Sequence, residues 1–366
     1  MKTCVSSYSF QPMLSSGELT QLQLIGKVKE IGFDGIEFID LMPEDGMSVE
    51  EYAKRLRDES ETKNLPIVNY TIGAELLNRP LDEECERLFR QVDIAEILGA
   101  SGMRHDATGG FNAPQSAYCG FDQALPTLIE GCRRVTEYAA EKGISTMVEN
   151  HGYFAQDSDR VEKLVTGVAN PNFGLLVDMG NFACADDPSD KAVGRVAKYA
   201  KHVHAKDFHI KSGSEPDPGR GFFRSRAGNY LRGAVIGHGN IPVAQCIGIL
   251  KRAGYDKYVS IEFEGIEQTL TGIEIGLENL KRFYSRRTGV KRLKESKKTH
   301  PKARRLRVHF YSFSSDSGSS APTKINSPFS ALQIYFLPVV TFPSSICSES
   351  LSSICCWITR LSGLAP

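Results

Sequence analysis

A short strand-like run followed by a helical segment recurs eight times between the N-terminus and residue 285. The predicted strands are Thr3–Phe10, Gly35–Ile39, Ile67–Ile72, Gly102–Asp106, Ser145–Asn150, Gly174–Asp178, His202–Asp207 and Tyr258–Glu264. The predicted helices are Leu19–Ile31, Ser48–Glu61, Leu81–Leu98, Asp122–Lys142, Ser158–Ala169, Pro188–Lys201, Pro242–Ala253 and Thr269–Ser285. Strands that alternate with helices predict a parallel sheet joined by right-handed crossovers.

Four junctions repeat one order, in which a helix end is followed by a glycine, a short loop and a strand. They read EIGFDGIEF, ILGASGMRH, EKGISTMVEN and RAGYDKYVSIEF. Glycine is expected at these places because it accepts the left-handed conformation that ends a helix. Eight such units match the size of a (β/α)8 TIM barrel, an α/β fold. A doubly wound open sheet is the structural alternative, but no GxGxxG or phosphate-binding loop follows an early strand.

The net charge of zero conceals an uneven distribution. Residues 291–366 hold 11 of the 44 Lys and Arg and 3 of the 44 Asp and Glu, so this tail carries +8 and the preceding body −8. An acidic body argues against a nucleic-acid partner, because binding to a phosphate backbone needs positive charge. The tail is basic over residues 291–307 and Ser-rich beyond, without a helical or strand period. We therefore predict a barrel over residues 1–288 and a low-complexity, disordered tail over residues 289–366.

The sequence favours a cytoplasmic location and no membrane partner. No run of 18 apolar residues is present, and the N-terminus is typical of a strand instead of a signal peptide. The nine cysteines include no CxxC pair, which favours free thiols in a reducing compartment. Barrels of this type often pair, so a homo-oligomer is compatible with the sequence.

Four successive predicted strands end in a carboxylate or an imidazole. The residues are Glu149, Asp178, His204 and Glu262. In a TIM barrel these strand ends meet at the face that holds the active site. One divalent cation would satisfy all four side chains, and three oxygen ligands with one nitrogen favour Mn, Mg, Co or Zn. The alternative for Glu149 or Glu262 alone is an ion pair with a lysine such as Lys206.

The same strands carry a family resemblance over about residues 1–286. The matching pieces are VENHG, LVDMGN, HVHAKD, YVSIEFEG and the turn GHGNIPV. With these pieces the body resembles the sugar phosphate isomerase/epimerase family. These xylose-isomerase-like TIM barrels include ketose 3-epimerases, inosose dehydratases and endonuclease IV.

The resemblance implies a single-metal enzyme acting on a small sugar or polyol. Glu149, Asp178, His204 and Glu262 would be the metal ligands, and Glu149 and Glu262 would also be the acid/base pair. One carboxylate would remove a proton next to a carbonyl to give an enediolate, and the other would return it, as in an isomerase or epimerase. A lyase that dehydrates a keto-sugar or keto-inositol on the same site is the first alternative. A barrel without catalytic activity that binds a partner is the second.

Further residues are candidates for contact with the substrate. Asn181 stands where the family often has histidine, which argues against the three-metal cluster of endonuclease IV. His151 follows Glu149 closely, and His105 ends the fourth predicted strand. In the predicted loop Phe208–Ile236, Arg232 is the preferred contact for an anionic substrate group.

Overall fold

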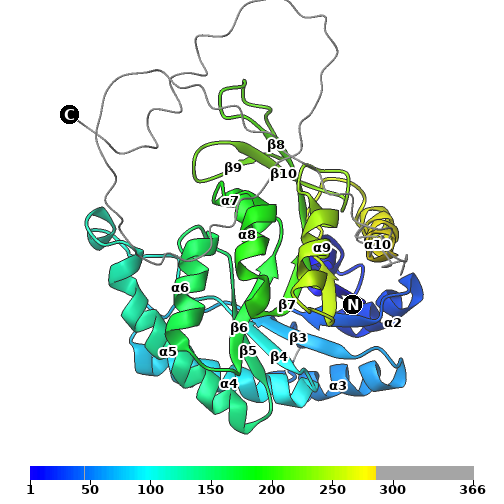
Figure 1. Ribbon diagram of the computed structural model, residues 1–366. Coiled ribbons are helices and arrows are strands. Elements are labelled where there is room, and N and C mark those ends of the chain that lie inside the picture. Colours follow the sequence, from blue (N-terminus) through cyan, green and yellow to red (C-terminus); the bar gives the residue numbers. More distant parts are fainter. Residues whose placement is uncertain (45, 286–366) are drawn as a thin grey trace, which may run out of the picture. The chain divides into compact units, whose positions relative to one another are not determined.

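The computed structural model describes residues 1–44 and 46–285, and Figure 1 shows them as a barrel of strands surrounded by helices. The barrel is closed and all of its strand pairs are parallel, in the order β1-β11-β7-β6-β5-β4-β3-β2. Its strands are β1 Lys2–Ser6, β2 Gly35–Phe38, β3 Ile67–Ile72, β4 Gly102–His105, β5 Ser145–Glu149, β6 Phe173–Asp178, β7 Ala200–Ala205 and β11 Tyr258–Ile261. The predicted TIM barrel is confirmed, and the predicted tail lies outside the described residues.

Helices connect the strands and cover the outside of the barrel (Figure 1). They are α1 Gln11–Ser15, α2 Gln21–Ile31, α3 Val49–Thr62, α4 Leu81–Leu98, α5 Phe121–Glu141, α6 Ser158–Val168, α7 Asn181–Cys184, α8 Ser189–Val196, α9 Val243–Arg252 and α10 Thr269–Ser285. The four junction glycines, Gly32, Gly99, Gly143 and Gly254, all have positive φ, as the sequence predicts. Ser48 caps α3 by accepting a hydrogen bond from the Glu51 backbone.

Two predicted elements end four or more residues earlier than expected. The first predicted strand turns after Ser6, whose hydroxyl accepts a bond from the Tyr8 backbone N–H and starts a 3-10 turn. The helix predicted to reach Lys201 ends at Val196, and β7 begins at Ala200. The main strand-and-helix order is unaffected by either difference.

The segment after β7 is a small sheet and not a loop. It contains the antiparallel strands β8 Asp207–Lys211, β9 Phe223–Arg224 and β10 Tyr230–Ala234, in the order β8-β10-β9. Because β8 begins two residues after β7 ends, this sheet stands at the carboxyl end of the barrel strands (Figure 1). A β-bridge joins Gly233 to Gly265, and a Cβ atom on Gly233 would lie 2.3 Å from the Glu264 carbonyl oxygen.

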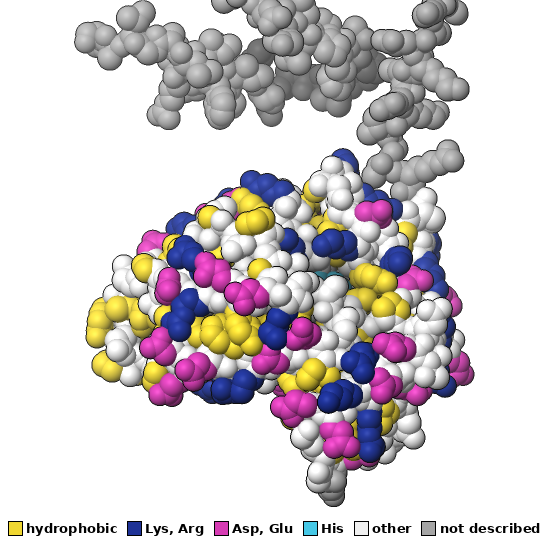
Figure 2. All heavy atoms as spheres, turned by 90° about the horizontal axis from the view of Figure 1, so that it is seen from below, with side chains coloured by type: hydrophobic (Ala, Val, Ile, Leu, Met, Phe, Trp, Pro, Cys, Tyr) yellow, Lys and Arg dark blue, Asp and Glu magenta, His cyan; other side chains and the backbone are white. Residues whose placement is uncertain are grey.

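On the face in Figure 2, acidic and basic side chains are interspersed with small hydrophobic areas. Lys142 illustrates the pattern, since its ammonium lies 2.9 Å from Asp93 and 2.8 Å from Glu96. Such exposed pairs contribute little to stability individually. Among the described helices, none has the length and apolar character needed to cross a membrane.

The turn GHGNIPV wraps around the carboxylate of Asp207. Its Oδ2 accepts backbone hydrogen bonds from Gly237 and Gly239, and its Oδ1 accepts from Ile241 and Phe208, all at 2.8–3.0 Å. A Cβ atom on Gly239 would lie 2.2 Å from Asp207 Oδ1, so only glycine fits there. The turn therefore fixes the chain next to the end of β7.

Asp207→Asn should destabilise the protein by about 2–3 kcal/mol, because one side of the amide then presents N–H groups to N–H donors. Urea unfolding of the full chain measures the change. Asp217→Asn, an exposed change in the same extension, should stay within about 0.5 kcal/mol of the parent. Equal stability of the Asp207 variant and the parent would contradict this interpretation of the turn.

Candidate metal and substrate site

Four side chains at the carboxyl end of the barrel converge on one point. They are Glu149, Asp178, His204 and Glu262, each offering one ligand atom within 4.8 Å of the others. His204 Nδ1 lies 3.7 Å from Glu149 Oε1, 3.7 Å from Asp178 Oδ2 and 3.6 Å from Glu262 Oε2. All four residues are buried, and the structure brings together the whole predicted ligand set.

Two atoms of this cluster favour a bound cation. Among the described residues, His204 Nδ1 and Asp178 Oδ2 have no hydrogen-bond partner, although both are buried. Burying such atoms unpaired is costly. A divalent cation between them would supply the missing partner, so the residues present fit a metal ion with mixed oxygen and nitrogen ligands.

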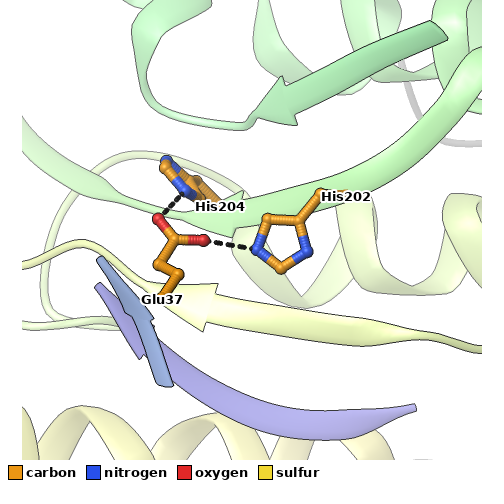
Figure 3. A group of neighbouring side chains, drawn as sticks. All are labelled: Glu37, His202 and His204. Atoms are coloured by element: carbon orange, nitrogen blue, oxygen red, sulfur yellow. Dashed lines mark hydrogen bonds and ion pairs between the residues drawn. The ribbon is translucent and has the colours of Figure 1, made fainter. Parts of the chain in front are cut away.

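The opposite side of the His204 ring is held by a buried carboxylate that the sequence analysis missed. Figure 3 shows Glu37, from β2, between His202 and His204. Glu37 Oε1 lies 2.6 Å from His204 Nε2, and Oε2 lies 2.6 Å from His202 Nε2. Burial by itself would raise the pKa of Glu37, but the two imidazoles hold it well below its usual range. A glutamate inside an otherwise apolar strand, GIEF, was the signal that could have revealed it.

Two buried cations, Arg104 and Lys206, flank the glutamates. Arg104 Nη2 lies 2.6 Å from Glu149 Oε2 and 2.8 Å from Asp106 Oδ1. Lys206 Nζ lies 2.5 Å from Glu262 Oε2 and 3.5 Å from Asp178 Oδ2. The lysine pairing that the sequence left as an alternative is thus present for Glu262, together with the cluster and not instead of it. Arg104 was not predicted; its charge in the middle of the strand GMRH was the available signal.

The two glutamates have different electrostatic surroundings. Burial raises the pKa of Glu149, although the Arg104 guanidinium opposes the shift. Burial also acts to raise the pKa of Glu262, but Lys206 and His204 outweigh it and lower that pKa well below the usual range.

The carboxylates of the region outnumber its permanent cations. Six carboxylates lie in or beside the cluster: Glu37, Asp106, Glu149, Asp178, Glu262 and Glu264. Only Arg104 and Lys206 oppose them as permanent cations in these contacts. The excess of negative charge in a buried region is a second reason why a divalent cation fits here.

Two of the predicted substrate contacts lie at the cavity. Asn181 Nδ2 donates to Glu149 Oε1 at 2.9 Å, and Lys206 Nζ donates to Asn181 Oδ1 at 3.2 Å. The Asn181 amide thus bridges Glu149 and Lys206. His151 lines the cavity and its Nδ1 lies 3.0 Å from Asp106 Oδ1.

The other two predicted contacts do not line this cavity. His105 is fully buried, with Nδ1 2.7 Å from the Asp106 carbonyl oxygen. Because side chains alternate along a strand, the inward position next to it belongs to Arg104. Arg232 lies 3.6 Å from Glu267 and over the ring of Phe222. Their roles toward a substrate remain predictions.

The cluster opens into a cavity of about 400 Å³. The lining of this cavity includes Glu149, Lys206 and Glu262. It also includes the aromatic side chains of Tyr8 and Phe223. This volume is at the small end of the range for pockets that bind small molecules. A groove of about 550 Å³ outside the barrel is larger, but among residues 1–44 and 46–285 no acidic or histidine side chain lines it.

The sequence matches a model of the xylose isomerase-like TIM barrel family over residues 25–283. An inosose dehydratase of Geobacillus thermodenitrificans is 24% identical over 258 residues, which cover 68% of this chain and 83% of the relative.

Solved structures share the fold at lower identity. The IOLI protein with a bound zinc atom has a TM-score of 0.60 at 16% identity, covering 78% of this chain and 98% of that one. The 3-keto-D-glucoside 4-epimerase of E. coli has a TM-score of 0.57 at 16% identity, covering 77% of this chain and 99% of that one.

His204→Ala should weaken binding of Mn²⁺ or Zn²⁺ at least tenfold, because it removes the imidazole nitrogen that faces the three carboxylates. Isothermal titration of the dialysed full chain measures the affinity. His238→Ala, which removes an exposed histidine, is the matched control and should bind the metal as the parent does. Parental affinity in the His204 variant would exclude this cluster as the metal site.

Proposed function

The chain belongs to the xylose isomerase-like TIM barrel family, and we propose that it is a divalent-metal-dependent isomerase or epimerase of a small sugar or polyol. It removes a proton from the carbon next to a carbonyl group and returns a proton to give the product. The ion is Mn, Mg, Co or Zn, held by the three carboxylates and the imidazole of the cluster.

The observation that carries the proposal is the convergence of two differently held glutamates on one buried cluster. Glu149 ends β5 and Glu262 follows β11, and β6 and β7 lie between these strands in the barrel. The two carboxylates therefore approach the cluster from different strands on either side. This arrangement suits proton removal by one glutamate and proton return by the other.

The surrounding residues keep each glutamate in place. Arg104 and Asn181 bind the two oxygens of Glu149, so the carboxylate has little freedom to rotate. Lys206 holds Glu262 at the other side. Such fixed positions reduce the entropy lost when the acid and the base align with the substrate. The bound ion would supply polarisation of the carbonyl oxygen, which makes the neighbouring C–H more acidic.

Dehydration is the second candidate, favoured by Lys206 and by the inosose dehydratase relative. Lys206 lines the cavity, and its ammonium is buried beside Glu262. After a glutamate takes the proton next to the carbonyl, the C–O bond at the adjacent carbon breaks. The departing hydroxyl takes a proton from Lys206 and leaves as water, and a carbon–carbon double bond remains.

Incubation with ketoses and keto-inositols in deuterated water tests the reaction class. The full chain loaded with Mn²⁺ should introduce solvent deuterium on the carbon next to the carbonyl, because the proton passes through a carboxylate. Mass spectrometry and NMR of the products give the result. A changed stereocentre or carbonyl position supports the isomerase, whereas loss of water supports the dehydratase. Absence of exchange with every compound would contradict both.

Glu149→Gln and Glu262→Gln should each lower kcat by roughly 100- to 10,000-fold, because an amide cannot accept the proton. Much of the metal affinity should remain, since the amide oxygen still offers a ligand. Initial rates and metal titration on the same preparations separate these effects. Glu162→Gln, on α6 and paired with Arg195 away from the cavity, is the control and should keep parental kcat. Full activity in both site variants would refute the acid/base assignment.

A further inference from the structure

Glu37 does not line the cavity. It contacts the His204 imidazole on the side opposite to the proposed metal ion. It is fully buried in the barrel interior, and the cavity lining does not include it. Its Oε1 is occupied by His204 Nε2 at 2.6 Å. In Figure 3 the other ring nitrogen of His204 points away from Glu37. That nitrogen, Nδ1, is the one that faces the three carboxylates of the cluster.

The second oxygen of Glu37 is fixed as firmly as the first. Glu37 Oε2 lies 2.6 Å from His202 Nε2 and accepts a bond of 3.0 Å from the Ser260 hydroxyl. His202 Nε2 and Ser260 Oγ are themselves 2.8 Å apart. Two of these partners, His202 and His204, come from β7 and the third, Ser260, comes from β11, so the Glu37 carboxylate on β2 is held by two other strands of the barrel.

Glu37, His202 and His204 could themselves be taken for a metal site, since their ligand atoms lie close together. The distances argue against it. Two ligand atoms that each lie about 2.0–2.1 Å from a tetrahedral ion are roughly 3.3 Å apart. The nitrogen–oxygen separations of 2.6 Å are those of hydrogen bonds.

The tautomer of a neutral His204 ring decides whether it can bind a cation. Three carboxylate oxygens lie within 3.7 Å of Nδ1, and they would attract a proton to that nitrogen. A proton on Nδ1 would block the lone pair that a metal needs. Glu37 competes for the same proton at Nε2, where its Oε1 lies at the hydrogen-bond distance of 2.6 Å, whereas the three oxygens that face Nδ1 lie 3.6–3.7 Å from it.

We infer that Glu37 is a positioning residue that keeps the ring proton of His204 on Nε2 and directs the Nδ1 lone pair toward the metal ion. Glu37 is not a ligand and does not touch the substrate. His202 and Ser260 support it by fixing its other oxygen. The inference rests on the proposed metal site, and partners of this kind typically change metal affinity by about 10- to 100-fold.

Glu37→Gln in the full chain tests the inference. Chelator competition should show zinc affinity about 10- to 100-fold weaker than in the parent, still with one ion per chain. In the zinc-loaded protein, NMR of the labelled imidazole should show the His204 Nε2 proton shifted upfield, because an amide is a weaker acceptor than a carboxylate. A purely structural role would not move this proton selectively.

Glu84→Gln is the matched control. Glu84 is a buried carboxylate on α4. It forms ion pairs with Arg79 and Arg87 and does not contact His204. It should lose stability and keep parental zinc affinity. If the same loss of affinity appears in this control, the effect is general destabilisation and the inference is overturned.

Ser260→Ala is a milder second variant if the Glu37 variant does not fold. It removes one hydrogen bond from Oε2 and should weaken zinc binding by roughly two- to tenfold.

Four further results overturn the inference. Unchanged zinc affinity in the Glu37 variant, or in the Ser260 variant when that one is used, overturns it while the proposed function stands. Complete loss of the ion in the Glu37 variant, as expected of a ligand, also overturns it. A parent chain that binds no zinc, manganese or cobalt overturns the proposed function, and the inference with it.

Discussion

Burial of opposite charges at one end of a closed barrel is the constraint on which the rest of the site depends. The strand ends carry carboxylates that are costly to bury, and each is matched by a cation or by a hydrogen-bond donor. Arg104 and Lys206 balance the two glutamates, whereas Asp178 Oδ2 and His204 Nδ1 have no hydrogen-bond partner among the described residues. For the proposed ion, a site with this pattern is organised before binding, so little rearrangement is needed.

The site has two layers along the barrel axis, and they differ in their access to the cavity. The upper layer faces the cavity and contains the groups able to exchange protons with a ligand. The lower layer contains Glu37 and His202, which contact each other and do not line the cavity. Because β7 carries His202 and His204 on the same side, one strand links the two layers. A rigid lower layer is what allows a single imidazole nitrogen to be presented in a fixed direction.

The sequence predicted most of the fold and the centre of the site, for identifiable physical reasons. Glycines at helix ends and the alternation of strands with helices predicted the barrel. The positions of four residues at the ends of successive strands predicted that their side chains lie together, and these residues are Glu149, Asp178, His204 and Glu262. Residues inside strands were harder to interpret. Glu37 and Arg104 lie in short buried runs, where only the register of the finished sheet shows which side chain points inward.

The segment after β7 was difficult for a different reason. Its polar composition and glycines are typical of a loop, yet antiparallel pairing with its own neighbours makes it a sheet. Arg232, the arginine chosen there, pairs with Glu267 instead of lining the cavity. The local sequence pattern could not predict the ion pair between Arg232 and Glu267, because Glu267 is more than thirty positions away in the sequence.

The bridge between Gly233 and Gly265 connects this accessory sheet to the chain just beyond Glu262. Because no Cβ atom fits at Gly233, its backbone is in direct contact with the backbone of Glu264 and Gly265. The accessory sheet is therefore attached directly to the segment that follows Glu262. A substitution that displaces Gly233 would therefore also displace the backbone three residues beyond Glu262.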